Sequence, residues 1–108
     1  MSKPKGKKKV LLERALNLWG TKFQLDMLQE ECAELIQAVS HYKRRKVNSF
    51  IEVLEEIVDV EIMLGQIKLA LLISFDKDKY EAIKRKKFKR LEERLNDQLP
   101  TTKKEGDL

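Results

Sequence analysis

Residues 50–73 read FIEVLEEIVDVEIMLGQIKLALLI, and the spacing of their apolar residues is the main indication of the fold class. Its apolar residues recur at spacings of three and four, which is the period of an α-helix. One face of the expected helix carries Phe50, Leu54, Ile57, Leu64 and Leu71. A second set extends the apolar surface almost to the opposite side and consists of Val53, Val60, Met63 and Ile67. A helix from Phe50 to about Ile73 that is hydrophobic nearly all round is expected to be buried.

The same period predicts three further helices. A short one runs from Val10 to Trp19, where Gly20 stops the apolar pattern. A longer one runs from Leu25 to Tyr42, and a last one extends from Asp78 to near Asn96. The chain has only four Gly and two Pro, too few for the many turns of a β-sandwich or barrel. The sequence therefore predicts an all-α fold, organised as a four-helix bundle.

Caps and apolar stripes refine these helices. Thr21 is the expected cap of the second helix, Asn48 or Ser49 of the third, and Asp78 with Glu81 of the fourth. The stripe of the second helix is expected to comprise Leu28, Cys32, Leu35, Ile36, Val39 and Tyr42. The core face of the fourth is expected to comprise Tyr80, Ile83, Phe88, Leu91 and Leu95.

Charge divides the chain into three regions. There are 23 Lys and Arg against 18 Asp and Glu, a net charge of +5, and the excess comes from five lysines that precede the first acid, Glu13. We expect a basic disordered tail over residues 1–9, a helical domain over 10–98 and a flexible C-terminal tail over 99–108. A Lys-rich tail attracts nucleic acid or anionic lipid weakly. Such tails more often only aid solubility, so nucleic acid is not expected as a partner.

The chain is expected to be cytoplasmic. Its one cysteine, Cys32, lies inside an apolar helical pattern and has no second cysteine with which to form an intramolecular disulfide. The longest apolar stretch, around Ile67 to Phe75, contains Lys68 and falls well short of the roughly 20 residues that span a bilayer. No membrane insertion is expected.

Four acidic residues lie at positions where their helices are expected to be shielded from solvent. Glu31 and Glu34 lie three residues apart at the margin of the second helix's stripe, and Glu56 and Asp59 repeat the spacing on the third helix. Each pair leaves one side of its helix on adjacent turns. A short basic link, residues 43–46, joins the two helices, which should pack antiparallel and bring the pairs to similar height. We expect the four carboxylates to converge.

Converging carboxylates repel one another unless a cation lies between them. Oxygen-only ligation is what hard divalent cations prefer, so this set predicts Mg²⁺, with Mn²⁺ as a substitute. A di-iron site needs Glu-x-x-His pairs, and the only histidine, His41, does not follow an acid by three residues; it is expected at the surface. The alternative is that the four acids face solvent and pair with Lys or Arg of neighbouring helices.

These residues resemble the MazG-like all-α nucleoside triphosphate pyrophosphohydrolases. The run Glu30-Glu31-Cys32-Ala33-Glu34 is similar to the E-E-x-x-E motif of that family, and Glu55-Glu56-Ile57-Val58-Asp59 is similar to its E-x-x-D motif. The resemblance covers roughly Ala15 to Leu95 and implies a MazG-like bundle. It also implies Mg²⁺-dependent hydrolysis of a ribo- or deoxynucleoside triphosphate to the monophosphate and pyrophosphate, for control or cleansing of the nucleotide pool.

The resemblance also suggests a role for individual residues. It makes Glu31, Glu34, Glu56 and Asp59 metal ligands and Glu30 the candidate that orients or deprotonates the attacking water. Phosphate-binding candidates on the fourth helix are Lys84, Lys87 and Arg90, with Lys22 as a second possibility. Trp19 is a candidate for stacking on the base, although an aromatic residue at helical spacing is more often part of a core.

Two expectations concern partners. The third helix has more apolar surface than this short chain can cover, which favours a homodimer or homotetramer whose contacts complete the core, as the resemblance also implies. Glu61 lies among the apolar residues of that helix, and its expected neighbour is Lys68 or a subunit interface. The alternative function is a non-catalytic binding module that presents the basic fourth helix to nucleic acid or to an acidic protein.

Overall fold

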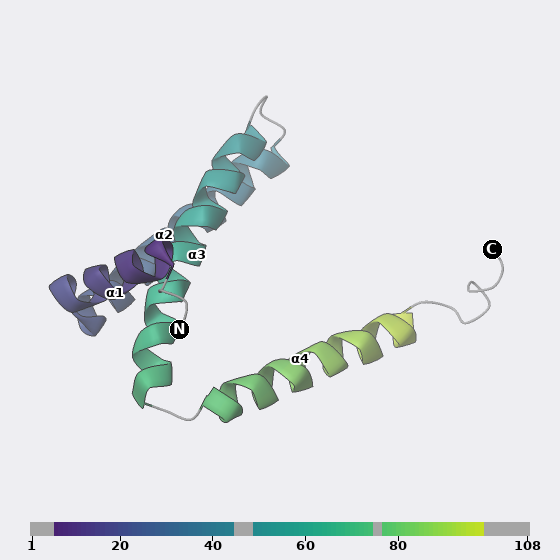
Figure 1. Ribbon diagram of the computed structural model, residues 1–108. Helices are drawn as coiled ribbons and strands as arrows, with labels where there is room; N and C mark the ends of the chain where they lie inside the picture. The colour runs from purple at the N-terminus through teal and green to yellow at the C-terminus, as the bar shows by residue number, and fades with distance from the viewer. Residues whose placement is uncertain (1–5, 45–48, 75–76, 99–108) are drawn as a thin grey trace. The chain divides into compact units, whose positions relative to one another are not determined.

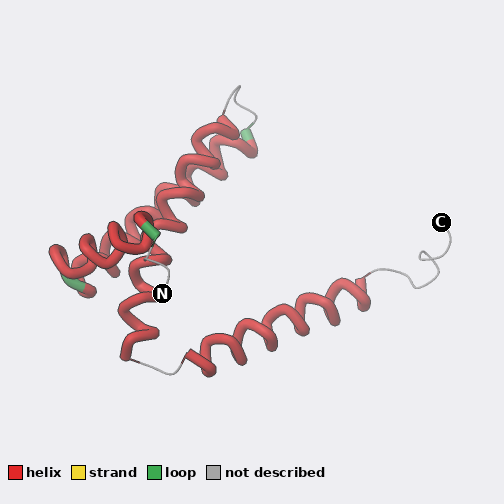
Figure 2. The backbone as a smooth tube through the Cα atoms, viewed as in Figure 1, coloured by secondary structure: helices red, strands yellow, loops and turns green. Residues whose placement is uncertain are grey.

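A computed structural model describes residues 6–44, 49–74 and 77–98. The described residues form four α-helices and no strand, as Figure 2 shows. The helices are α1 (Lys7–Trp19), α2 (Thr21–Lys43), α3 (Ser49–Ser74) and α4 (Lys77–Gln98). The all-α prediction and its four helices are confirmed, with bounds within a few residues of those expected.

Three residues expected to cap the helices are in fact part of them. Thr21 is the first residue of α2 and Gly20 is the cap, with a φ of 87° that favours glycine over residues with a Cβ. The Gly20 N–H donates to the Leu16 carbonyl at 2.8 Å, and its carbonyl accepts from Gln24 N–H at 3.1 Å, so one residue ends α1 and begins α2. Ser49 and Asp78 likewise lie inside their helices.

The expected tails fall mostly outside the described residues. Residues 1–5 and 99–108 are not described, and neither is Asn48, the other candidate cap of α3. Lys7, Lys8 and Lys9 are exposed residues of α1 rather than part of a tail, because the helix begins earlier than its apolar pattern does.

The chain divides into two compact units, Met1–Ser74 and Phe75–Leu108. In the first unit α2 and α3 lie side by side along most of their length, and α1 packs against both (Figure 1). The run of α2 is antiparallel to that of α3, because His41 near the end of α2 lies beside Glu52 near the start of α3. At the other end, Gln24 of α2 bonds to Gln66 of α3. The expected helical hairpin is therefore present.

The core of the first unit lies between α2 and α3. Its buried hydrophobic residues are Ala38, Val60, Met63 and Ile67, and its buried polar residues are Gln24, Ser49 and Gln66. The stripe expected for α2 is wrong at Ile36, Val39 and Tyr42, which are exposed. The face of α2 that contacts α3 instead contains Gln24 and Ala38, which are buried. The helix is therefore rotated about its axis relative to the orientation expected from its apolar residues, and a glutamine occupies a core position.

α1 approaches α3 closely at Gly65. A Cβ built on Gly65 would lie 2.9 Å from Cδ1 of Leu12, closer than such atoms normally come. The absence of a side chain at Gly65 therefore lets Leu12 rest on the α3 backbone. This contact fixes α1 on a different face of α3 from the one that α2 covers.

One face of α3 remains open in the first unit. Its apolar residues are between 37% and 53% exposed and comprise Phe50, Leu54, Ile57, Leu64 and Leu71. The expectation that α3 is buried nearly all round is therefore wrong within this unit. The reason is geometric, since α1 and α2 together cover only part of the circumference of the helix.

The second unit is described through α4 alone. Its expected core residues Ile83, Phe88, Leu91 and Leu95 are each about half exposed or more, whereas Tyr80 is half-buried. None of the helices in the described ranges has a stretch both long and apolar enough to span a bilayer.

The buried glutamine pair supplies a test of the fold. Nε2 of Gln24 donates to Oε1 of Gln66 at 2.5 Å, and Nε2 of Gln66 points to the sulfur of Met63 at 3.8 Å. Gln24→Leu leaves a buried amide without its partner and should lower the free energy of unfolding by about 1–3 kcal/mol. The double variant Gln24→Leu/Gln66→Leu should lose clearly less than the two single changes added together. Urea unfolding followed by circular dichroism measures all three, with the exposed Gln29→Leu as control.

Candidate metal centre

Glu31 occupies a core position of α2. It lies seven residues after buried Gln24 and seven before buried Ala38, so all three follow one line along the helix that faces α3. The seven-residue spacing is two helical turns. Glu31 itself is half-buried. The position of a carboxylate in this line is unfavourable without a compensating partner.

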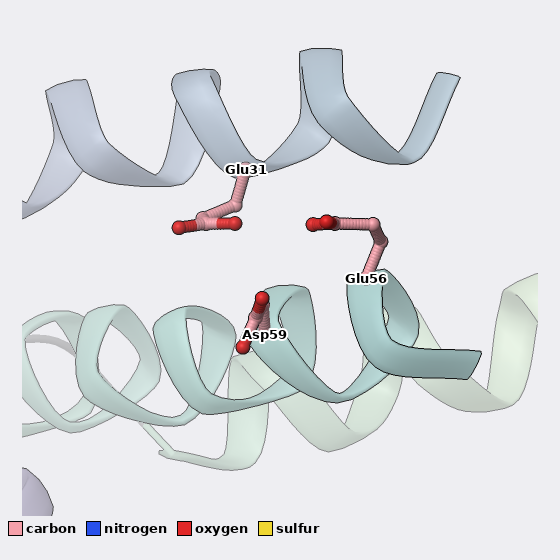
Figure 3. A group of neighbouring side chains, drawn as sticks. All are labelled: Glu31, Glu56 and Asp59. Atoms are coloured by element: carbon pink, nitrogen blue, oxygen red, sulfur yellow. The ribbon is translucent and has the colours of Figure 1, made fainter. Parts of the chain in front are cut away.

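Glu56 and Asp59 of α3 lie close to Glu31 of α2. Glu56 is half-buried and lies four residues before buried Val60 and seven before buried Met63, while Asp59 is more exposed. One carboxylate oxygen from each of Glu31, Glu56 and Asp59 lies within 4.8 Å of the others. Figure 3 shows the three side chains pointing into the space between the two helices. We call these three residues the carboxylate cluster.

The electrostatics of the cluster are unfavourable for the protein alone. Oε1 of Glu31 and Oε1 of Glu56 are buried and have no hydrogen-bond partner among the described residues. Burial raises the pKa of Glu31, and the charges of Glu34, Asp59 and Glu56 raise it further. Burial likewise raises the pKa of Glu56, with Glu34 and Asp59 adding to the effect. Both side chains therefore resist ionisation in a position where they have no cationic neighbour among the contacts described.

The donor set fits a hard divalent cation. Three carboxylates from two helices supply oxygen ligands only, which is the chemistry that Mg²⁺ and Mn²⁺ accept, and Mg²⁺ keeps several waters beside a few carboxylates. The two buried oxygens without partners are the acceptors that such a cation would satisfy. Asp59 is exposed, so the site opens to solvent on one side.

The other predicted ligand, Glu34, lies beside the cluster and not inside it. Its carboxylate is close enough to raise the pKa of both Glu31 and Glu56, yet it is exposed and outside the group whose oxygens lie within 4.8 Å. Glu30, the candidate for activating water, is exposed on α2. The structure thus brings three of the four predicted ligands together.

The predicted substrate-binding residues lie on three helices. Trp19 ends α1 with 54% of its surface exposed, and Lys22 is exposed in the first turn of α2. The remaining three are exposed residues of α4 in the second unit and comprise Lys84, Lys87 and Arg90.

A polar pocket adjoins the cluster. It has a volume of about 280 Å³ and is lined by residues that include Glu34, Glu56, Gln37 and Glu55. At its far end Nδ1 of His41 lies 3.4 Å from Oε1 of Glu52. Since four glutamates border this pocket, a phosphate chain could enter only with its charge neutralised by cations.

Sequence reasoning missed several of these features. The Gln24–Gln66 bond was not foreseen, because glutamine normally indicates a solvated position. The signal was available in the seven-residue spacing of Gln24, Glu31 and Ala38, which places all three on one line. His41 was expected at the surface, and its side chain is about one third exposed there, beside Glu52.

Comparison with known proteins adds no identification. No protein-family model, no curated protein and no solved structure matches the chain.

The raised pKa values predict how stability depends on pH. An acid whose pKa is higher in the folded than in the unfolded chain favours folding only while it is protonated, so its contribution is lost as pH rises above about 4.5 through the folded pKa. Glu31→Gln should therefore stabilise the metal-free protein at pH 7 and have little effect near pH 4.

Thermal unfolding in the presence of a chelator tests this prediction. The comparison is between the wild type, Glu31→Gln and the control Glu30→Gln, which removes an exposed glutamate one residue away. A stabilisation that is equal at both pH values, or equal in both variants, would contradict the prediction.

Proposed function

We propose that this chain is a Mg²⁺-dependent nucleoside triphosphate pyrophosphohydrolase of MazG-like type, which cleaves a ribo- or deoxynucleoside triphosphate to the monophosphate and pyrophosphate. The observation that carries the proposal is the carboxylate cluster, in which acids of two motifs, Glu31 from one and Glu56 and Asp59 from the other, meet across an antiparallel hairpin. The three oxygens within 4.8 Å, two of them buried without a partner, support a cation as the missing component.

In this proposal Glu31, Glu56 and Asp59 hold the cation, and Glu34 borders the pocket where a further ligand or water would lie. A divalent cation bound there supplies a Lewis acid that neutralises phosphate charge and lowers the pKa of water. The water oxygen bonds to the α-phosphorus, the bond from that phosphorus to the bridging αβ oxygen breaks, and pyrophosphate leaves. Glu30 is the proposed acceptor of the proton released by the water.

Cations on the chain would bind the rest of the substrate. Lys22 and Trp19 are exposed near the α1–α2 junction, where Lys22 could contact phosphate and Trp19 could stack on a base. Lys84, Lys87 and Arg90 are exposed and offer a second set of phosphate contacts. The open apolar face of α3 supports a homodimer or homotetramer as the active form.

The decisive experiment is hydrolysis of a nucleotide panel. Purified protein is incubated with ribo- and deoxynucleoside triphosphates and Mg²⁺, and the products are resolved by ³¹P NMR. Monophosphate with pyrophosphate is the expected result. Diphosphate with phosphate would contradict the proposed cleavage between the α and β phosphates but would still indicate a metal-dependent hydrolase. No turnover with either Mg²⁺ or Mn²⁺ would contradict the proposal that the chain is an enzyme.

The metal itself can be tested by stability as well as by activity. At a hundredfold excess over its Kd, a cation that binds only the folded state adds about 2.7 kcal/mol to the free energy of unfolding. Glu56→Gln and Asp59→Asn should remove this gain and lower kcat/KM by about 100-fold or more, while the helices remain intact by circular dichroism. The control is Glu13→Gln, on α1 and outside the cluster, which should keep both the gain and the activity. Stabilisation by Mg²⁺ that survives Glu56→Gln would contradict the assigned site.

The alternative function is a binding module that uses α4. This helix carries nine Lys or Arg against five Asp or Glu, and nearly all of its residues are exposed. Binding of duplex DNA that weakens steeply with salt, in a protein that Mg²⁺ does not stabilise, would favour this function over hydrolysis.

A further inference from the structure

His41 borders the polar pocket that adjoins the carboxylate cluster. The pocket has a volume of about 280 Å³, and four glutamates, Gln37, Ala38 and His41 line it. Among the described residues of this lining, His41 is the one whose side chain can carry a positive charge near neutral pH. It is about one third exposed, so a ligand in the pocket can reach it. A negatively charged ligand would therefore find its cationic contact at this residue.

The pocket extends from the cluster toward the end of α2. Glu56 belongs both to the cluster and to the lining of the pocket, whereas Glu52 lies at the far end beside His41. Glu52 precedes Glu56 by four residues, which is about 6 Å along the axis of α3. From its first to its last phosphorus, a triphosphate chain has a similar span. A phosphate chain with one end at the cluster would therefore have its other end near His41.

The lining suits a phosphate group better than a nucleobase. Ala38 is its apolar member, and none of its described residues is aromatic, so it offers no surface on which a base could stack. Nδ1 of His41 lies 3.4 Å from Oε1 of Glu52. An imidazolium donates from both ring nitrogens, so His41 can keep Glu52 on one nitrogen and give the other to a phosphate oxygen.

Acidic neighbours surround His41 on both helices of the hairpin. Their negative charge attracts an imidazolium and repels a phosphate, so a phosphate would enter only when a divalent cation at the cluster and the imidazolium together offset that repulsion. Lys43 and Arg44 follow His41 on α2, but both are exposed and outside the lining of the pocket. The acidic neighbours are Glu34 of α2 and Glu52, Glu55 and Glu56 of α3.

We propose that protonated His41 binds the terminal phosphate of the substrate, so that the pocket selects substrates by the length of their phosphate chain. This inference rests on the proposed hydrolase and adds to it a residue that determines specificity. With the α-phosphate at the metal, the γ-phosphate of a triphosphate lies beside His41. A nucleoside diphosphate in the same position ends short of His41 and binds without this contact.

Kinetics with phosphate chains of two lengths test the role of His41. His41→Gln should raise the KM for a triphosphate by about tenfold and change kcat by less than about threefold, because the lost contact is made in the ground state as well as in the transition state. The Ki of the matching diphosphate, measured as a competitive inhibitor, should change by less than about twofold. The control Lys43→Gln removes a nearby positive charge outside the pocket and should leave both constants unchanged.

Two further measurements separate contact with phosphate from a structural role. His41→Lys keeps a positive charge at every pH used and should recover most of the lost affinity for triphosphate. In the wild type, the KM for triphosphate should rise toward that of His41→Gln as pH increases through the range in which imidazole loses its proton.

NMR tests the contact without turnover. His41 is the only histidine in the chain, so its imidazole proton signals are identified without any variant. A triphosphate analogue whose αβ bridging oxygen is replaced by a methylene group is added with Mg²⁺, and it should shift the His41 signals in the ¹H spectrum. The corresponding diphosphate analogue should leave these signals nearly unchanged.

The outcomes distinguish failure of this inference from failure of the hydrolase. Absence of turnover with every triphosphate overturns the hydrolase. Turnover with a KM that His41→Gln does not change, or an equal loss of affinity for triphosphate and diphosphate, overturns the contact with the terminal phosphate and leaves the hydrolase standing. His41 signals that shift equally with both analogues overturn selection by chain length. Circular dichroism confirms that His41→Gln keeps its helices, and if it does not, the NMR comparison on the wild type decides the question.

Discussion

The antiparallel packing of α2 on α3 is the constraint on which the rest of the first unit depends. It buries Ala38, Val60, Met63 and Ile67, and it places Gln24 opposite Gln66 at one end and His41 beside Glu52 at the other. The carboxylate cluster lies between these two polar contacts, beside the buried core residues. The apolar core thus fixes where the acids meet, and acids on a differently packed pair of helices would point apart.

The carboxylate cluster makes the packing of α2 on α3 less favourable. Burial and mutual repulsion raise the pKa values of Glu31 and Glu56, and the buried oxygens of both lack partners in the described residues. A fold selected only for stability would place apolar residues at such positions, because they would extend the core without charge repulsion. The acids are unfavourable for the protein alone, and the cation proposed above would supply the interactions that their buried oxygens lack. A local loss of folding stability at such positions is typical of functional sites.

The sequence predicted the helices and the meeting of the two acidic motifs, since both follow from residue spacing along a helix. It did not predict the rotation of α2, which exposes Ile36, Val39 and Tyr42 and gives core positions to Gln24 and Glu31. Periodicity reports where apolar residues lie and not which of them a partner helix covers. The same limit explains why Glu34 was expected inside the cluster. Glu31 and Glu34 are three residues apart and lie on the same side of α2, but Glu31 is half-buried and Glu34 is exposed.

Different sides of α3 contact different helices. The side that carries Glu56 is set by α2 of the same chain, and the contact of Leu12 with Gly65 fixes α1 on another side. What remains is an exposed apolar line that comprises Phe50, Ile57, Leu64 and Leu71. Because Glu31, Glu56 and Asp59 all belong to the one hairpin of α2 and α3, the proposed metal site would take its three carboxylate ligands from a single chain.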